Sequence, residues 1–177
     1  TEEFSKLLYK GTLRHSYPHS WRSKAPLIYR NTPQWFISME KNNLRDIALK
    51  SIDETIFYPP QGQTRLRSMI ETRPDWCVSR QRVWGVPLPL FVNKKTGQPL
   101  RDENIINRIA DIYEKEGSNT WFTEDPQRFL GDEYSLEDYE QVKDVVEVWF
   151  DSGSTHAFCL EQREDLKWPA SMYLEGS

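Results

Sequence analysis

The sequence predicts a mixed α/β fold assembled from parts of an open sheet. Short apolar runs with strand character alternate with helix-like periods along the 177 residues, an order that is typical of α/β architecture. Acidic residues such as Asp151 and Glu175 come directly after two of the later apolar runs. Because ligands of open α/β sheets bind beyond the carboxyl ends of the strands, we expect a binding site at these strand ends.

The first third of the chain is predicted to be rich in β-structure. An amphipathic helix over residues 4–8, ending near Gly11, precedes strand-like runs at 25–30 and 34–38. Turn-forming residues at 31–33 separate the two runs. We therefore expect two short strands joined by a turn.

Two helices and a strand are predicted next. Apolar residues recur at helical spacing over 44–52, and either Asn42 or Asn43 can cap that helix. A second short helix is expected after a cap at Thr64. Residues 76–78 then read as a strand, because an aromatic, a thiol and a β-branched residue follow one another there.

Prolines and turn residues mark the middle of the chain. Residues 86–92 read as a strand that Pro87 and Pro89 confine to a sheet edge, because proline donates no backbone hydrogen bond. A hairpin turn is expected at 93–97. Asp102 is then expected to cap a helix, since apolar residues follow it at helical spacing.

The rest of the chain is predicted to hold an acidic loop, two strands and a helix. The loop covers 114–144 and is followed by a buried strand at 145–150. Asp or Ser within 151–154 is the expected N-cap of a helix that runs to residue 159, and the free N–H groups there could also bind a phosphate. A last strand is expected at 171–174.

Charge is unevenly distributed along the chain. The formal net charge is −4, which argues against a free-standing protein that holds nucleic acid by its overall charge. Residues 1–33 nevertheless carry six basic against two acidic side chains, whereas residues 102–147 carry four basic against fourteen acidic ones. Only the N-terminal segment is therefore suited to face phosphate.

Cysteine usage and the chain ends bear on the cellular setting. Cys77 and Cys159 lie far apart in apolar surroundings, which favours two reduced, buried thiols over a disulfide and indicates the cytoplasm. No apolar run approaches the length of a membrane span, and no signal peptide is recognisable. Since the first residue is not Met, we expect an excised fragment of a longer protein.

Four blocks of sequence carry a family resemblance. The most informative is RPDWCVSRQRVWGVP at 73–87, which combines two tryptophans with several forked donors. The other three are HSYPHSWRSKAP at 15–26 with NTPQWF at 31–36, VWFDSGSTH at 148–156, and MYLEGS at 172–177. In wording, order and spacing these blocks resemble the isoleucyl family of class I aminoacyl-tRNA synthetases, more closely than the valyl or leucyl families.

The resemblance implies a division of the chain into four parts. Residues 1–57 would be the β-rich returning arm of the editing insertion, and residues 58–92 a first portion of the Rossmann-type catalytic domain. Residues 93–144 would form a small acidic α+β insertion, and residues 145–177 a truncated second Rossmann portion. The expected fold class is therefore α/β, with a partial Rossmann-type domain.

The resemblance also implies an activity for the parent protein. It would form isoleucyl-adenylate from isoleucine and ATP with Mg, and then transfer isoleucine to its tRNA. The family's His-Ile-Gly-His motif, its Lys-Met-Ser-Lys-Ser loop and its editing-pocket segments do not occur in this sequence. We therefore expect the isolated chain to be inactive and to bind no cofactor.

Trp149 and Glu175 are the two predicted ligand-binding residues. Trp149 ends an apolar run, so it reads as a core aromatic or, by the resemblance, as the wall that packs against the isoleucine side chain. Glu175 reads as a solvated turn acid or, by the resemblance, as a contact to isoleucyl-adenylate. No catalytic residue is expected within the chain.

Four basic residues have two open interpretations. Arg80 and Arg82 lie between two tryptophans, so they suit either RNA contact or a structural frame that pins neighbouring segments. Arg22 and Lys24 belong to the basic N-terminal segment, which the family's tRNA crosses, although a solvated face is the simpler reading. RNA binding through these residues would depend strongly on salt.

A zinc site is not expected. His15 and His19 lie near Ser20 and Ser23, where some relatives place cysteine ligands. Two histidines without thiolates fall short of a structural zinc site. No metal is therefore predicted for the chain itself.

A second class of function competes with the synthetase interpretation. The chain could be a non-catalytic RNA-binding or interaction module derived from such an enzyme and used alone. A start Met, a complete strand order or a basic surface would favour that alternative, and the sequence has none of them. The oligomeric state stays open.

Overall fold

The structure is a computed structural model that describes residues 8–174. The chain divides into two compact units, Thr1–Pro33 and Gln34–Ser177. Each unit is therefore described by itself. None of the helices in residues 8–174 is both long and apolar enough to cross a membrane.

The first unit is built around one turn and carries little regular structure. His19 and Pro26 form an isolated antiparallel bridge, and Lys24 occupies the left-handed region with φ 59°. The Lys24 N–H donates to Ser20 O at 2.8 Å and closes the turn. The strand expected at 25–30 is therefore wrong, because the chain pairs only next to the turn and Pro26 has no N–H to extend a ladder. Most of the helix expected at 4–8 lies outside the described residues, and Leu8 is not helical.

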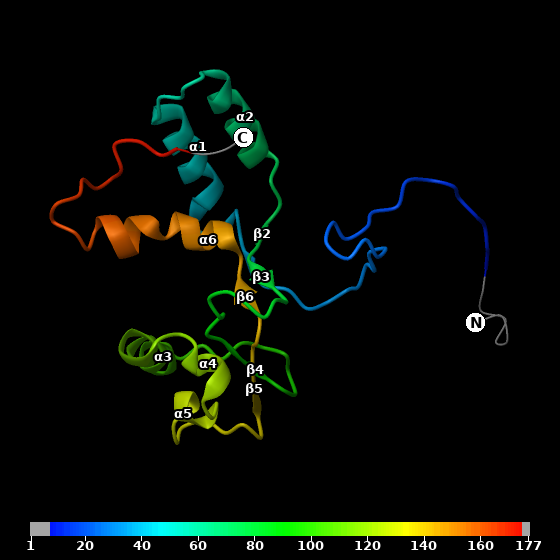
Figure 1. The fold of residues 1–177 in the computed structure, drawn as a ribbon. Helices are drawn as coiled ribbons and strands as arrows, with labels where there is room; N and C mark the ends of the chain where they lie inside the picture. Colours follow the sequence, from blue (N-terminus) through cyan, green and yellow to red (C-terminus); the bar gives the residue numbers. More distant parts are fainter. Residues whose placement is uncertain (1–7, 175–177) are drawn as a thin grey trace. The chain divides into compact units, whose positions relative to one another are not determined.

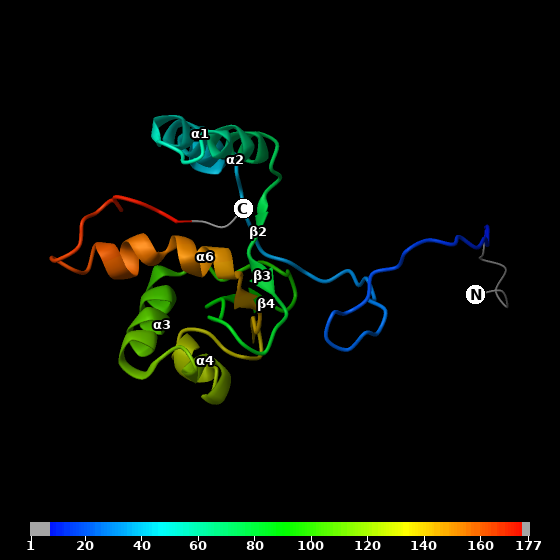
Figure 2. The same cartoon turned by 45° about the horizontal axis from the view of Figure 1, so that its top comes forward.

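The second unit begins with a strand pair and a helix pair. Strand β1 (Phe36–Ile37) pairs antiparallel with β2 (Trp76–Cys77). Between them, helices α1 (Leu44–Glu54) and α2 (Gln61–Glu71) lie side by side (Figures 1 and 2). Both helices and the strand at residue 76 were predicted, and the structure confirms them.

Asn43 stands at the N-cap position of α1, as expected, whereas the expected cap of α2 is wrong. Asn43 precedes α1 in a left-handed conformation, and its side chain makes no capping hydrogen bond. Helix α2 begins three residues before Thr64, directly after Pro60. Proline suits a helix start because the first N–H groups of a helix have no partner in the helix.

The side chain of Arg45 joins α1 to the end of α2. Its Nη1 donates to Ile70 O at 2.5 Å and to Glu71 O at 3.1 Å. Its Nη2 donates to Arg73 O at 2.8 Å. These carbonyls lie at the C-terminus of a helix, where a cation is favourable. One guanidinium therefore fixes the exit from α2 toward β2.

Two further antiparallel pairs complete the β-structure of residues 34–174. Strand β3 (Ser79–Arg80) pairs with β6 (Val145–Val146), and β4 (Phe91–Asn93) pairs with β5 (Tyr139–Gln141). The described residues thus hold helices and three two-stranded sheets, an α/β mixture without parallel pairs. The run expected at 86–92 is regular only from residue 91, after the two prolines that withhold donors. The turn at 93–97 is confirmed: Gly97 has φ 68°, and its N–H donates to Asn93 O at 2.8 Å.

Close backbone approach explains the glycine of the RPDWCVSRQRVWGVP block. A Cβ added at Gly85 would lie 2.8 Å from Val145 Cγ2, and the residue has φ 149°. The neighbouring Val86 O accepts the N–H of Val146 at 2.7 Å. The block thus runs along β6 closely enough that only glycine fits at this point.

The acidic segment, residues 93–144, supplies most of the buried hydrophobic cluster of the described chain. Helix α3 (Glu103–Glu116) is capped by Asp102, whose Oδ1 accepts the Asn104 N–H at 2.9 Å, as predicted. Helices α4 (Thr120–Thr123) and α5 (Gln127–Leu130) follow, so the expected loop at 114–144 is wrong. The apolar residues of α4 and α5 join those of α3 and β4 in one buried cluster, which consists of Phe91, Ile105, Ile109, Trp121, Phe129 and Leu130.

The chain turns into a helix where a strand was expected. Strand β6 ends at Val146, and helix α6 (Val148–Gly153) begins after an N-cap at Glu147; a π-helical turn, η2 (His156–Leu160), follows it. Trp149 therefore lies on the first turn of a helix, and Asp151 is not a cap. The cause is local, because the Glu147 side chain accepts a backbone N–H that a longer strand would have used. Residues 171–174 form no strand.

Candidate functional site

A hollow of about 430 Å³ lies in the second unit, beside the start of α6. One wall comes from the segment that leads from α2 through β2 into β3, and the other from the N-terminus of α6. Its lining combines aromatic, acidic and basic side chains, namely Arg73, Pro74, Asp75, Trp76, Cys77, Arg80, Glu147 and Trp149. Small-ligand sites typically join apolar walls to a few placed polar groups in this way.

Trp149 presents a large apolar face at this hollow. Its side chain is 57% exposed, and its neighbours Val148 and Phe150 are 64% and 42% exposed. Phe150 lies against Trp76, with ring centroids 6.1 Å apart. The first turn of α6 therefore shows aromatic surface to solvent rather than to a core, which rules out a core role for Trp149 within the described residues.

Glu147 is the buried acid of the hollow. The residue is only 5% exposed, and its Oε1 accepts the backbone N–H of Trp149 at 3.1 Å. Its Oε2 is buried and has no hydrogen-bond partner. The backbone N–H of Glu147 donates to Val78 O at 2.8 Å, which ties the residue to the chain between β2 and β3. Most buried polar atoms are hydrogen-bonded, so an orphan carboxylate oxygen beside a hollow marks an unusual position.

Arg80 braces the opposite wall. Its Nη1 donates to Cys77 O at 3.0 Å and to Ser79 O at 2.8 Å. The opposite end of this wall is held by Asp75, whose Oδ1 accepts the Met39 N–H at 2.9 Å. Arg80 thus binds backbone carbonyls of its own segment, and no ion pair within residues 8–174 joins it to Glu147.

Asp151 lies one turn further along α6 than Glu147, close enough for the charge of Glu147 to shift its pKa. Burial raises the pKa of Asp151 above its ordinary value, and the negative charge of Glu147 raises it further. Two acids therefore crowd the first turns of this helix. A carboxylate near a helix N-terminus is ordinarily favourable, but here the second one is penalised by its surroundings.

The structure brings only part of the predicted site set together. Trp149 and Arg80 line the same hollow, whereas Arg82 is exposed and does not line it. Glu175 lies outside the described residues. The sequence did not single out Glu147, although one signal was present. This acid interrupts the apolar run at 145–150, two residues before Trp149.

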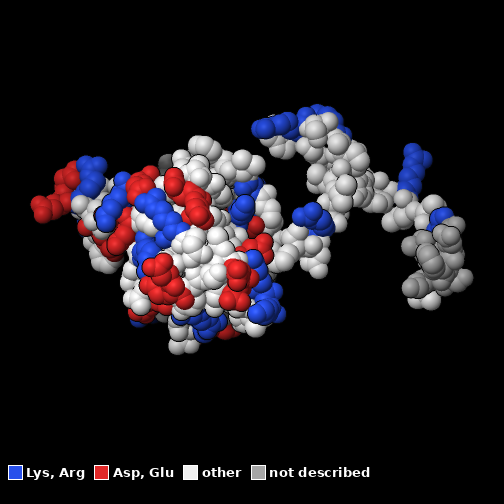
Figure 3. Space-filling model, turned by 90° about the horizontal axis from the view of Figure 1, so that it is seen from below, with Lys and Arg blue, Asp and Glu red and all other residues white. Residues whose placement is uncertain are grey.

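Arg22 and Lys24 belong to the first unit, where the described residues 8–33 carry five basic side chains and no acidic one. Figure 3 shows these side chains as blue patches without red, whereas on the second unit blue and red alternate over the face in view. The Arg22 guanidinium lies 5.0 Å from the centroid of the Trp21 ring, and both residues are exposed. This pairing of cation and ring leaves the outer edges of both groups accessible.

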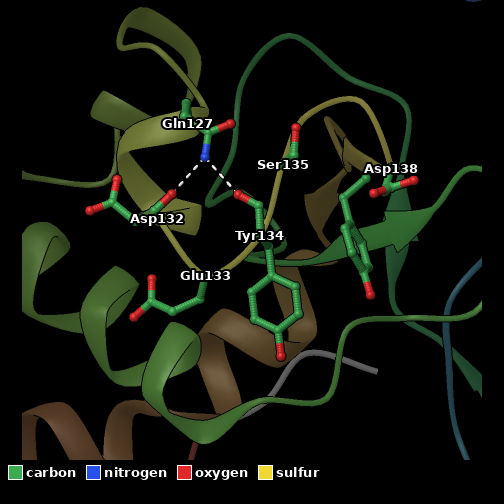
Figure 4. A pocket seen from close by; sticks show the side chains of 8 residues that line it. Gln127, Asp132, Glu133, Tyr134, Ser135 and Asp138 are labelled. Carbon is green, nitrogen blue, oxygen red and sulfur yellow. Dashed lines mark hydrogen bonds between the residues drawn. The ribbon is translucent and has the colours of Figure 1, made fainter.

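A second hollow, of about 470 Å³, lies in the acidic segment (Figure 4). Gln127 reaches across it, and its Nε2 donates to Gly131 O at 2.6 Å and to Tyr134 O at 2.7 Å. Glu133 on its rim pairs with Arg108 at 2.7 Å, and this partner lowers the pKa of the carboxyl. These polar groups serve the loop itself, so the hollow is structural.

The two histidines of the first unit lie within hydrogen-bonding distance of backbone carbonyls. His15 Nδ1 lies 2.9 Å from Ser16 O, and His19 Nδ1 lies 2.7 Å from Tyr17 O. Among residues 8–174 no group of three or more His, Cys, Asp or Glu side chains is placed to hold a metal ion. The absence of zinc stays a prediction.

Comparison with known proteins places the sequence in one family. Residues 9–177 match the family described as tRNA synthetases class I (I, L, M and V). An isoleucine–tRNA ligase of Pelagibacter ubique (strain HTCC1062) is 69% identical over 176 residues, which cover 99% of this chain and 19% of that protein. The isoleucine–tRNA ligases of Brucella abortus (strain 2308) and Gluconobacter oxydans (strain 621H) are 59% and 55% identical, over 97% of this chain and 18% of each protein. The chain thus spans about a fifth of the length of the curated relatives that it matches, and the predicted resemblance is confirmed.

Proposed function

The chain belongs to the class I tRNA synthetases, and we propose that it is part of an isoleucine–tRNA ligase. The observation that supports this most strongly is the 69% identity to a protein named isoleucine–tRNA ligase, across 99% of the chain. The parent would activate isoleucine with ATP and Mg and then esterify its tRNA in the cytoplasm. The 177 residues alone would be inactive, because the family's phosphate-binding motifs are not among them.

The proposal assigns the hollow beside α6 to the isoleucine side chain. Trp149 would supply the apolar wall, since its exposed indole offers a branched alkyl group dispersion contacts and burial. Glu175, the first residue after the described range 8–174, would contact isoleucyl-adenylate. Catalysis in the parent would come from positioning and charge stabilisation around the phosphate, and the chain contributes the wall rather than a reacting group.

The division into four parts also belongs to this proposal. Residues 1–57 would be the returning arm of the editing insertion, residues 58–92 and 145–177 portions of the Rossmann-type domain, and residues 93–144 a small second insertion. The buried cluster supports the last assignment, because all of its residues except Phe91 lie within 93–144. The mixture of helices and short sheets is compatible with the rest.

Arg22 and Lys24 would contact the tRNA backbone. The described part of the first unit carries only basic charges, and the cation on the Trp21 ring offers a surface suited to RNA. Arg82, in the second unit, is exposed and would be a tRNA contact of its own, whereas the carbonyl contacts of Arg80 support a bracing role.

Amino-acid-dependent exchange of pyrophosphate into ATP tests the function in the full-length protein. We expect isoleucine to give the highest kcat/KM among the standard amino acids. The isolated 177-residue chain should show no exchange above a blank without enzyme. A full-length protein that prefers another amino acid would refute the proposal.

Trp149→Ala tests the wall in the same assay. Loss of about 1.5–3 kcal/mol of apolar contact predicts a rise of roughly 10- to 100-fold in the KM for isoleucine, with the KM for ATP unchanged. Trp168→Ala is the matched control, because Trp168 is 56% exposed and does not line the hollow. Equal effects of the two substitutions would remove the assigned role of Trp149.

A further inference from the structure

Glu147 uses one carboxylate oxygen as a helix cap and leaves the other unpaired. Oε1 holds the N–H of Trp149 at 3.1 Å, and the residue's own N–H is held by Val78 O at 2.8 Å. Through its backbone N–H and its carboxylate together, Glu147 thus connects the wall that includes β2 and β3 to the first turn of α6. That turn carries the indole that faces the hollow.

We propose that Glu147 is a positioning residue for isoleucine, which acts by fixing the backbone of Trp149 and with it the direction of the indole. This role rests on the proposed function, in which Trp149 is the isoleucine wall. Helix α6 continues through residues 154–155 into η2, but the N–H groups of its first turn have no partner in the helix, so that turn depends on the cap. Glu147 Oε1 accepts the backbone N–H of Trp149 itself. Loss of this cap would therefore loosen Trp149 before the rest of the helix.

Stability alone does not account for this residue. A buried carboxylate oxygen without a partner costs free energy, and Ser, Thr, Asn or Asp would cap a helix with fewer atoms to bury. The same charge also raises the pKa of Asp151, after the larger effect of burial. Glu147 therefore caps the helix at a cost in stability. A role in positioning a neighbouring site residue explains its presence better than stability does.

The test uses isoleucine-dependent pyrophosphate exchange by the full-length protein. Glu147→Ala and Glu147→Met both remove the acceptor, and the methionine keeps the length of the side chain in case the alanine variant fails to fold. Each should raise the KM for isoleucine by roughly tenfold, the loss of about one capping interaction, and leave the KM for ATP within about twofold. Glu147→Gln retains an acceptor for the Trp149 N–H and should stay within about threefold of the parent protein. Glu140→Gln, at an exposed acid on β5, is the control that should change neither constant.

A double substitution separates positioning from a general structural role. If Glu147 acts through the indole, Glu147→Met should add nothing to the KM for isoleucine once Trp149 is alanine, since coupled residues are not additive. Additive effects, or an equal rise in the KM for ATP, would overturn the proposal. A Glu147→Gln protein as impaired as Glu147→Met would also overturn it, because the unpaired oxygen would then contact the ligand directly. An unsubstituted protein without isoleucine-dependent exchange would refute the proposed function, and the positioning role would fall with it.

Discussion

Trp121 and Trp149 lie in the same unit of the chain but in opposite surroundings. Trp121 is 0% exposed, contacts the rings of Phe91 and Phe129, and donates from Nε1 to Val142 O at 2.8 Å. Trp149 is more than half exposed and stands at the edge of a hollow. The acidic segment therefore buries its Trp in a core, whereas the α6 region exposes its Trp beside a hollow. If Trp149 has the proposed binding role, stability and binding depend on separate tryptophans within this unit.

Truncation of the two tryptophans should give the largest difference between the regions. Trp121→Ala is expected to lower the free energy of unfolding by about 3–5 kcal/mol, because it removes a fully buried indole and leaves a cavity. Trp149→Ala should cost less than about 1 kcal/mol, since an exposed side chain loses little burial. Urea unfolding, followed by far-UV circular dichroism, measures both. Equal losses would contradict the separation of core and binding surface.

The caps of α3 and α6 provide a second comparison. Asp102 uses both oxygens, since Oδ1 accepts the Asn104 N–H and Oδ2 accepts the Tyr134 hydroxyl at 2.9 Å. Asp102→Ala should cost about 1–2 kcal/mol in urea unfolding. Glu147→Ala should cost less, because it also removes a buried unpaired oxygen.

A spectroscopic signal checks the Asp102 contact independently. The hydrogen bond to Asp102 is the main cause that raises the pKa of Tyr134. In the Asp102→Ala protein this pKa should therefore fall toward its ordinary value in an ultraviolet titration. An unchanged Tyr134 titration would show that the contact is not made in solution.

The smallest expected effect is the pH dependence that Asp151 contributes. Its pKa is raised from 3.8 in the folded chain, so the folded state binds the proton more tightly than the unfolded state. The stabilisation is present at acid pH and is lost as pH rises from about 3.8 through the folded pKa. Asp151→Asn should remove this loss, so the variant gains stability relative to the parent protein as pH rises through that window. Asp111→Asn, at an exposed acid on α3, is the control, and the comparison is made by urea unfolding at pH 3 and pH 7.

Local patterns predicted the helices better than they predicted the site. Helix α3 was readable because one apolar stripe and one capping aspartate lie within a few residues of each other. The fold of 114–144 was not, since Trp121 and Phe129 belong to helices of four residues whose burial depends on partners distant in sequence. The run at 145–150 had strand composition, but the strand ends at Val146 and Glu147 caps the helix that follows. Composition identified Trp149 as an aromatic of interest. That Oε2 of Glu147 is buried without a hydrogen-bond partner can be seen only in the folded structure.

The clamp made by Arg45 has a mechanical consequence. One planar cation grips the carbonyls of Ile70, Glu71 and Arg73, and Arg73 is itself part of the hollow's lining. The α1–α2 hairpin is thereby linked mechanically to this wall of the hollow. A displacement of α1 would therefore be transmitted through Arg45 to the backbone of Arg73, one of the residues that line the hollow.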